Sequence, residues 1–73
     1  MMNWHYDKQT QTWKLLVDGW RAMVLQSADS YTWFGIIKRT DFHHERYESP
    51  EFESPQKSCA WCETEIAKRL LGE

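Results

Sequence analysis

The chain has few residues that cross-link the backbone or set its conformation: its 73 residues include only two cysteines, two prolines and three glycines. Two cysteines are too few for the disulfide framework of a small secreted domain, so reducing surroundings and a cytoplasmic location are expected. No segment approaches the ~20 apolar residues that a membrane-spanning helix needs, and residues 1–10 contain no apolar run typical of a signal peptide. The sequence therefore predicts neither a secreted nor a membrane protein.

The chain also lacks an excess of basic residues. Nine Lys and Arg residues stand against eleven Asp and Glu residues, which gives a formal net charge of −2 at pH 7. Proteins that bind nucleic acid without regard to sequence, or that bind anionic membranes, normally have a basic excess. The charge balance argues against both kinds of partner but is compatible with a local basic patch.

Aromatic side chains are abundant: they make up 15% of the residues and include five tryptophans. A chain of this length forms one small domain and buries only about 60% of its unfolded surface, so its stability is marginal. Large rings supply much contact area per residue and can take the place of disulfides. A single folded domain over residues 1–73 is predicted.

The pair Asp18-Gly19 is the strongest local signal, because it lies between two strand-like runs at 12–17 and 20–26. A two-residue type I′ turn requires positive φ at both central positions, which Asp and Gly tolerate. Such a turn places Val17 opposite Trp20, and alternate residues of both runs then share one face of a sheet.

Polar turns at 7–10 and 27–30 bound two further predicted strands, at about 3–6 and 31–39. If each turn has four residues, all four tryptophans of the sheet fall on one face. The predicted pairs on that face are Trp4 with Trp13, Val24 with Trp33, Ala22 with Gly35, and Trp20 with Ile37.

A polar stretch at 40–53 contains Pro50 and predicts an irregular crossover, within which a short edge strand around 44–48 remains open. Ser54-Pro55 is typical of a helix start and Gly72 of a stop, which predicts a helix at about 55–71. An apolar stripe along that helix consists of Cys59, Cys62, Ile66 and Leu70.

The predicted fold class is thus α+β: a four-stranded antiparallel β-meander with one C-terminal helix packed on its tryptophan face. Ala22 and Gly35, paired near the centre of that face, would leave room for the helix backbone to approach. A bulky residue at Gly35 should destabilise the fold.

The same register leaves the opposite face of the sheet uncovered, because a single helix shields only one side. Apolar groups rimmed by charges commonly mark protein contacts. The predicted function is a small non-enzymatic interaction protein, an adaptor or inhibitor of a kind that phages and other mobile elements encode, with a protein partner or a second copy of the chain as a homodimer. The predicted contact residues on this face are Leu16, Arg21, Met23, Leu25, Phe34 and Ile36, with Lys14 and Lys38 beside them.

An alternative remains open at this point. The crossover could fold back over the same face with Phe42, Tyr47 or Phe52, in which case the face would belong to the core.

Trp61 is a further candidate contact, since helical spacing places it beside Lys57 and Lys68 and away from the apolar stripe. Aromatic anchors dominate the energies of many interfaces. The competing interpretation packs Trp61 against the crossover near Pro50 or Phe52.

The segment Cys59-Ala60-Trp61-Cys62 could in principle bind zinc together with His43 and His44, or form a redox pair. The spacing matches no standard zinc finger, and adjacent His side chains in an extended chain point apart. As a redox motif, the cysteines lie a full turn inside the predicted helix and lack a βαβ setting. Ordinary buried thiols, with no metal or other cofactor, are predicted.

Groups that could act as a general acid or base cluster in sequence at His43, His44, Glu45, Tyr47 and Glu48. Catalysis also needs a pocket, and a small domain whose core is filled with tryptophan offers little concavity. No enzymatic activity is predicted.

A second functional class comes from topology. An antiparallel sheet followed by a packed helix, with Lys14, Arg21 and Lys38 on the free face, resembles the AP2 and integrase arm-type DNA-binding domains. The resemblance covers topology alone, over residues 12–71, and it implies a sheet lying in the major groove of DNA. The acidic overall charge and the apolar residues of that face depart from a typical groove reader.

Overall fold

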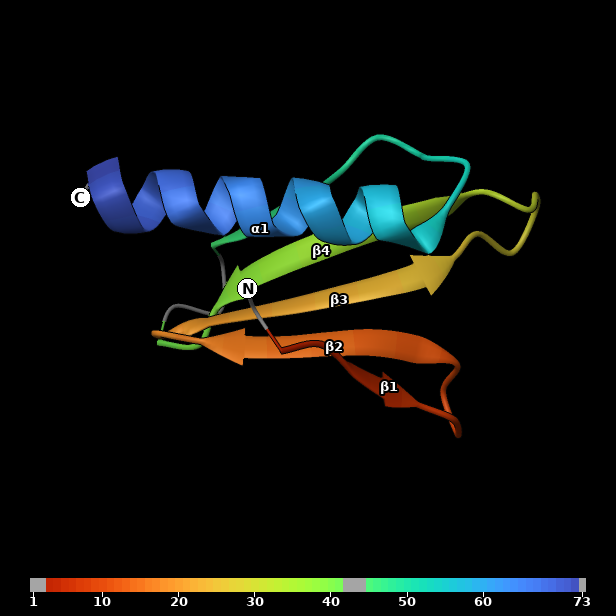
Figure 1. Cartoon of the computed structure of the whole chain (residues 1–73), viewed down its shortest axis with the longest axis horizontal. Coiled ribbons are helices and arrows are strands. Elements are labelled where there is room, and N and C mark those ends of the chain that lie inside the picture. The colour runs from red at the N-terminus through yellow and green to blue at the C-terminus, as the bar shows by residue number, and fades with distance from the viewer. Residues whose placement is uncertain (1–2, 42–44, 73) are drawn as a thin grey trace.

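The computed structural model describes residues 3–41 and 45–72 as a five-stranded antiparallel sheet followed by one helix. The helix, α1 (Pro55–Gly72), lies across one face of the sheet and packs on β3 and β4 (Figure 1). The predicted α+β class is confirmed, with a fifth strand added to the meander. In chain order and in sheet order the strands are β1 (His5–Asp7), β2 (Thr12–Val17), β3 (Trp20–Gln26), β4 (Trp33–Arg39) and β5 (Arg46–Glu48).

The tight turn between β2 and β3 forms as the sequence predicts. Asp18 has a φ of 44° and Gly19 a φ of 84°, so both central residues are in the left-handed region that a type I′ turn requires. Val17 pairs with Trp20, and the ladder continues with Leu15 opposite Ala22 and Trp13 opposite Val24.

The pairing of β1 with β2 is shifted by two residues from the predicted register. Tyr6, rather than Trp4, stands opposite Trp13, because β1 continues to Asp7. The Asp7 carboxylate accepts a hydrogen bond from the Gln9 backbone N–H at 3.0 Å, and Gln11 takes a φ of 55°, so the turn comprises residues 8–11 instead of 7–10.

The β3–β4 connection is longer than predicted. It spans residues 27–32 and is closed by the Ser27 N–H donating to the Thr32 carbonyl at 2.8 Å. Val24 therefore pairs with Gly35 instead of Trp33, and Tyr31, predicted to open the strand, is 90% exposed in the loop. Because both registers shift by two residues, every side chain keeps its predicted side of the sheet.

The short edge strand that the sequence left open around 44–48 forms within the crossover as β5, which pairs with β4 and places Tyr47 opposite Ile37. Farther on, Trp33 and Phe52 form a bridge with two backbone hydrogen bonds of 2.7 Å. Paired residues of antiparallel strands project to the same side, so Tyr47 and Phe52 lie on the α1 side of the sheet. Neither residue folds back over the opposite face, and Phe42 lies outside the described residues.

The helix begins as predicted, with the Lys57 N–H donating to the Ser54 hydroxyl at 3.3 Å, and runs one residue beyond the predicted end. Its buried stripe differs from the prediction: Ser58, Cys62 and Ile66 are buried, whereas Cys59 is half-buried and Leu70 is 40% exposed. Gly35 is the reason, because the missing side chain lets the Ser58–Cys62 turn approach β4.

The core lies between the sheet and α1. Trp13, Trp20 and Trp33 of the sheet and Trp4, just before β1, all lie on this side; Trp20 is 1% exposed, and the other three are half-buried against the core. The fully shielded cluster consists of Leu15, Trp20, Ala22, Val24, Ile37, Cys62 and Ile66.

A cationic side chain closes the core at the end of α1. Arg69 lies over the ring of Tyr47, with the guanidinium carbon 4.1 Å from the ring centroid, and 5.8 Å from that of Trp20. Arg69 also donates to the Glu65 carboxylate at 2.8 Å, one helical turn away. These contacts fix the edge strand β5 to the helix.

Candidate binding surface

The sheet face turned away from α1, called the free face here, has an apolar centre. Met23, Leu25 and Phe34 are half-buried, and Ile36 is only 8% exposed. These four residues, the apolar patch, are neighbours through the pairs Met23 with Ile36 and Leu25 with Phe34. Leu16 lies at the margin of the patch and is 69% exposed.

A line of cations, called the basic row here, crosses three strands beside this patch. Arg21 on β3 stands opposite Lys38 on β4, and Lys38 stands opposite Arg46 on β5. Side chains opposite one another in a sheet are about 5 Å apart at Cβ, and like charges in such pairs repel. The sequence groups these residues only through the register, and Arg46 is the member that sequence reasoning missed, because β5 was not assigned.

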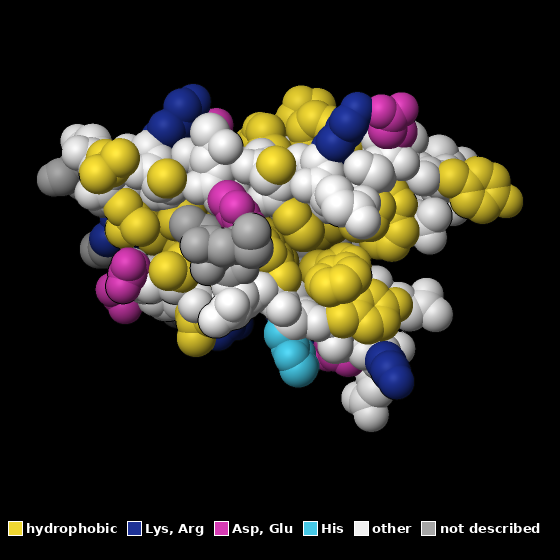
Figure 2. All heavy atoms as spheres, in the orientation of Figure 1, with side chains coloured by type: hydrophobic (Ala, Val, Ile, Leu, Met, Phe, Trp, Pro, Cys, Tyr) yellow, Lys and Arg dark blue, Asp and Glu magenta, His cyan; other side chains and the backbone are white. Residues whose placement is uncertain are grey.

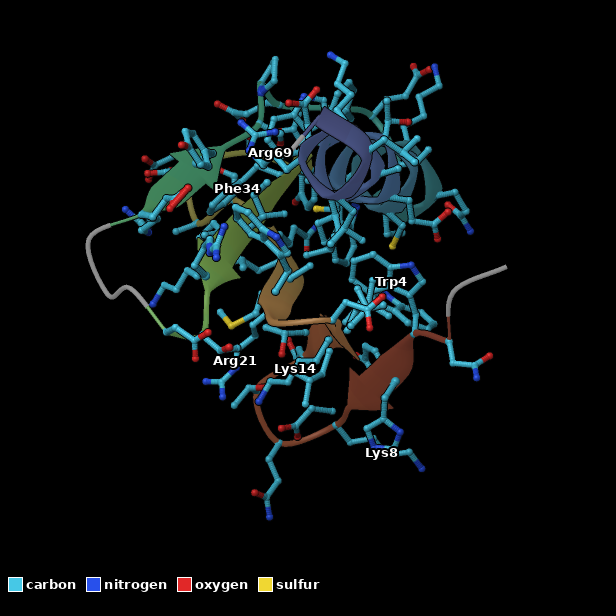
Figure 3. The ribbon with its side chains drawn as sticks, turned by 90° about the vertical axis from the view of Figure 1, so that its left-hand side faces the viewer. Trp4, Lys8, Lys14, Arg21, Phe34 and Arg69 are labelled. Atoms are coloured by element: carbon cyan, nitrogen blue, oxygen red, sulfur yellow. The ribbon has the colours of Figure 1, made fainter. Side chains whose placement is uncertain are left out.

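Carboxylates near the free face are already paired with other cations. Lys14 contacts Asp7 at 3.1 Å, and Arg46 contacts Glu48 at 3.2 Å. The Lys14 ammonium, by hydrogen bonding, holds the pKa of Asp7 below its ordinary value. Over the described part of the chain, Arg21 and Lys38 have no carboxylate partner. Figure 3 shows Lys14 and Arg21 on the side of the sheet away from α1.

Trp61 does not join this surface, because it lies on α1, on the other side of the sheet. It is half-buried and packs against the core cluster. The full exposure that a free-standing aromatic anchor would have is therefore not observed.

The two cysteines have the environment of buried thiols. Burial raises the pKa of Cys62 to about 12 and that of Cys59 to about 11, with the nearby Glu63 carboxylate a smaller cause for both. A thiolate is the reactive and metal-binding form, so both shifts oppose redox chemistry at neutral pH. His43 and His44 of the nominal zinc set lie outside the described residues, and the remainder of the chain holds no metal-binding cluster.

The residues considered for acid–base chemistry separate in space. Tyr47 and Glu48 are adjacent in β5 and therefore project to opposite sides of the sheet, Tyr47 toward α1 and Glu48 toward the free face. Glu45 lies next to Arg39, with a nitrogen–oxygen distance of 4.0 Å. Residues 43 and 44 again lie outside the described residues.

A groove on the α1 side of the sheet was not found from the sequence. It is a groove of about 290 Å³ between the first half of α1 and the β1–β2 hairpin, lined by Trp4 and Trp13 and by Cys59 and Glu63 of the helix. Because α1 packs on β3 and β4 and leaves β1 and β2 to one side (Figure 1), Trp4 and Trp13 line a groove beside the helix. A comparison of the width of one helix with the width of the four-stranded sheet that the sequence predicts could have predicted this gap.

No family model, curated protein or solved structure matches this chain. Within residues 3–41 and 45–72, no helix has the length and apolar character needed to span a lipid bilayer. The assignment of function therefore rests on the surfaces themselves.

Proposed function

We propose that this chain is a non-enzymatic protein-binding domain whose free face docks on a protein surface with an apolar centre and acidic groups beside it. The observation that carries the proposal is the apolar patch lying next to Arg21 and Lys38, two cations without a carboxylate partner in the described structure. Apolar centres with charged rims are typical of protein interfaces.

The charges of the free face favour an acidic partner over a second copy. In a two-fold symmetric dimer both copies bury the same face, so one interface would contain two basic rows, which face each other where they lie near the two-fold axis. Juxtaposed like charges in an interface cost several kcal/mol. Asp7 and Glu48 are already paired with Lys14 and Arg46, so they do not relieve this repulsion.

The proposal is tested with two pairs of variants in affinity capture from the native host. Phe34→Asp places a charge in the apolar patch, and Tyr31→Asp places the same charge in the exposed β3–β4 loop as its control. Arg21→Glu combined with Lys38→Glu reverses the unpaired charges, and Lys57→Glu combined with Lys68→Glu makes the same change on the exposed side of α1. Near-ultraviolet circular dichroism confirms that each variant is folded.

The expected result is a partner that the wild type and both controls retain and both free-face variants lose, and whose cross-links map to β3 and β4. Binding should also weaken with salt, because unpaired cations contribute to it. A partner that the free-face variants retain would overturn the proposal. Sedimentation equilibrium adds one further outcome: a dimer abolished by Phe34→Asp would replace the acidic partner with a second copy.

The basic row supports one other candidate function, the binding of duplex DNA through the free face of the sheet. Arg21, Lys38 and Arg46 span three strands and could neutralise neighbouring phosphates, whereas the apolar patch beside them offers no hydrogen-bonding groups to read base edges. Titration of labelled duplex DNA at low salt, with Arg21→Glu as the comparison, separates the two functions. Salt-dependent binding lost in that variant would favour DNA, and its absence at low salt would exclude it.

A further inference from the structure

The groove between α1 and the β1–β2 hairpin, called the indole groove here, combines aromatic rings with a carboxylate. Its walls include two indole rings, those of Trp4 and Trp13, and a carboxylate, that of Glu63. No Lys, Arg or His lines it among the residues that the structure describes. Figure 2 shows hydrophobic side chains gathered between the helix and this hairpin, and Figure 3 shows Trp4 between the sheet and α1.

The carboxylate of Glu63 is held in place by a neutral donor. The Trp4 indole N–H donates to it at 2.7 Å, which joins the segment before β1 to the third turn of α1. This hydrogen bond orients the carboxylate without neutralising its charge. Glu63 forms no ion pair within residues 3–41 and 45–72.

A second ring supports the wall that Trp13 provides. Tyr6 stands opposite Trp13 in the sheet, and their ring centroids lie 4.9 Å apart with a tilt of 55°. Tilted aromatic pairs of this kind are favourable and restrict the motion of both rings. The position of the Trp13 indole is therefore set before any ligand arrives.

Indole faces and a carboxylate share one preference: both attract cations. The face of an aromatic ring carries partial negative charge, and Trp is the best of the rings in this respect. An apolar wall also favours a cation with an apolar surface, since its desolvation costs less than that of a compact ammonium. Alkylated ammonium groups meet both requirements, and aromatic cages are a known means of binding them.

We propose that the indole groove binds a small quaternary ammonium compound of the size of choline, with its head group between Trp4 and Trp13 and its charge facing Glu63. An anionic ligand would be repelled by that carboxylate, and a neutral apolar ligand would gain nothing from it. The volume of about 290 Å³ lies at the lower end of ligand pockets and suits a head group better than a large ligand. The site is separate from the free face and does not depend on the proposed function.

The first experiment compares choline with 3,3-dimethylbutan-1-ol, the neutral molecule of the same shape, by following the tryptophan indole N–H signals in ¹H–¹⁵N NMR spectra. Choline should shift the Trp4 and Trp13 signals in a saturable way, with a dissociation constant in the millimolar range, and the alcohol should bind at least about tenfold more weakly. Absence of saturable shifts up to about 100 mM choline, or equal binding of the alcohol, would overturn the proposal. A peptide with a trimethyllysine side chain binding more tightly than choline would replace the small ligand with a modified protein.

The second experiment uses matched variants. Glu63→Gln keeps an acceptor for the Trp4 indole but removes the charge, and should weaken choline binding about tenfold while leaving the alcohol unaffected. Glu53→Gln removes the same charge outside the groove and should change nothing. Trp4→Leu should abolish the response of the Trp13 signal to choline, and a dispersed amide spectrum confirms its fold. Binding of choline to Glu63→Gln at wild-type strength would contradict the assigned role of the carboxylate.

Discussion

Gly35 and Cys62 face each other at the closest approach of α1 to the sheet, where a Cβ added to Gly35 would stand 2.5 Å from the Cys62 Sγ and 3.4 Å from the Ser58 carbonyl oxygen. Gly35 and Cys62 are both buried, so the Cys62 side chain cannot turn outward into solvent to make room for an added methyl group. The prediction from sequence that Gly35 permits a close approach of the helix is thus supported by the geometry, although Gly35 pairs with Val24 rather than Ala22.

Gly35→Ala should lower the free energy of unfolding by about 1–3 kcal/mol, because the added methyl group overpacks the contact with Cys62. Combining Gly35→Ala with Cys62→Ala should cost less than the sum of the two single changes, since the second change removes the clashing sulfur. Urea denaturation of the four proteins measures this coupling. Additive effects would show that the helix moves away from the sheet instead of clashing.

Two serines one helical turn apart should respond to Ala in opposite directions. Ser54 accepts a hydrogen bond from the Lys57 N–H, so Ser54→Ala should cost about 0.5–2 kcal/mol. The Ser58 hydroxyl is buried without a partner in the described structure, so Ser58→Ala should be neutral or stabilising by up to about 1 kcal/mol. Thermal and urea denaturation measure the change in the free energy of unfolding for both variants. A destabilised Ser58→Ala would indicate a hydrogen bond that the hydroxyl makes in solution.

The ion pair of Asp7 and Lys14 should be detectable as a lowered pKa of the Asp7 carboxyl group. Lys14→Met should raise the pKa of Asp7 toward its ordinary value, whereas Lys8→Met, in the same hairpin, should leave it unchanged. Because folding lowers this pKa, the contribution of the pair to stability is present above the unfolded pKa and is lost as the pH falls through the folded one. Carbon-detected NMR of the Asp7 carboxyl measures the shift. An unchanged titration in Lys14→Met would mean that the ion pair does not persist in solution.

The cysteines should react slowly in the folded protein. With pKa values raised to about 11 and about 12, Cys59 and Cys62 hold few thiolates at pH 8, so iodoacetamide should label them much more slowly than in urea. Mass spectrometry resolves the two sites, and Cys62, which is fully buried, should be the slower. Rapid labelling of Cys62 at pH 8 without denaturant would contradict the buried position.

The raised pKa of Cys62 should make the stability of the folded protein depend on pH in the alkaline range. The unfolded chain releases the Cys62 proton near its ordinary pKa of 9.0, while the folded chain keeps it to about 12. The folded state thus binds more protons in this window, and its stability should fall as the pH rises from about 9 to about 12. Cys62→Ala should reduce that slope in urea denaturation measured across the window, and an identical slope would indicate a thiol pKa close to its ordinary value.

The sequence predicts which face of the sheet each side chain occupies more reliably than it predicts the loops. Asp18-Gly19 tolerates φ values that few other pairs do, so one hairpin and its register could be predicted. The 8–11 and 27–32 loops depend on side-chain hydrogen bonds of Asp7, Ser30 and Thr32, which composition alone does not reveal. Side-chain alternation kept each face correct, because both errors moved the register by an even number of residues.

The elements missed or misplaced share a tertiary origin. β5, which the sequence left open as an edge strand around 44–48, has three residues and pairs along the outer edge of β4. Ser58 is buried because Gly35 has no side chain and that turn of α1 packs close to β4. The spacing of apolar residues along the helix does not reveal this close approach. Of the candidate surface, Arg21, Lys38 and the apolar patch could be placed from the register, whereas Arg46 and the indole groove required the position of β5 and of the helix.

The order of the elements along the chain also bears on synthesis. Since α1 follows all five strands, it is synthesised after them, and the indole rings on that face stay exposed until it packs. The nascent meander would therefore present two apolar faces at once, a form prone to aggregation. A chaperone that shields the meander until residues 55–72 have packed should then raise the fraction of the protein that reaches its native state in a cell.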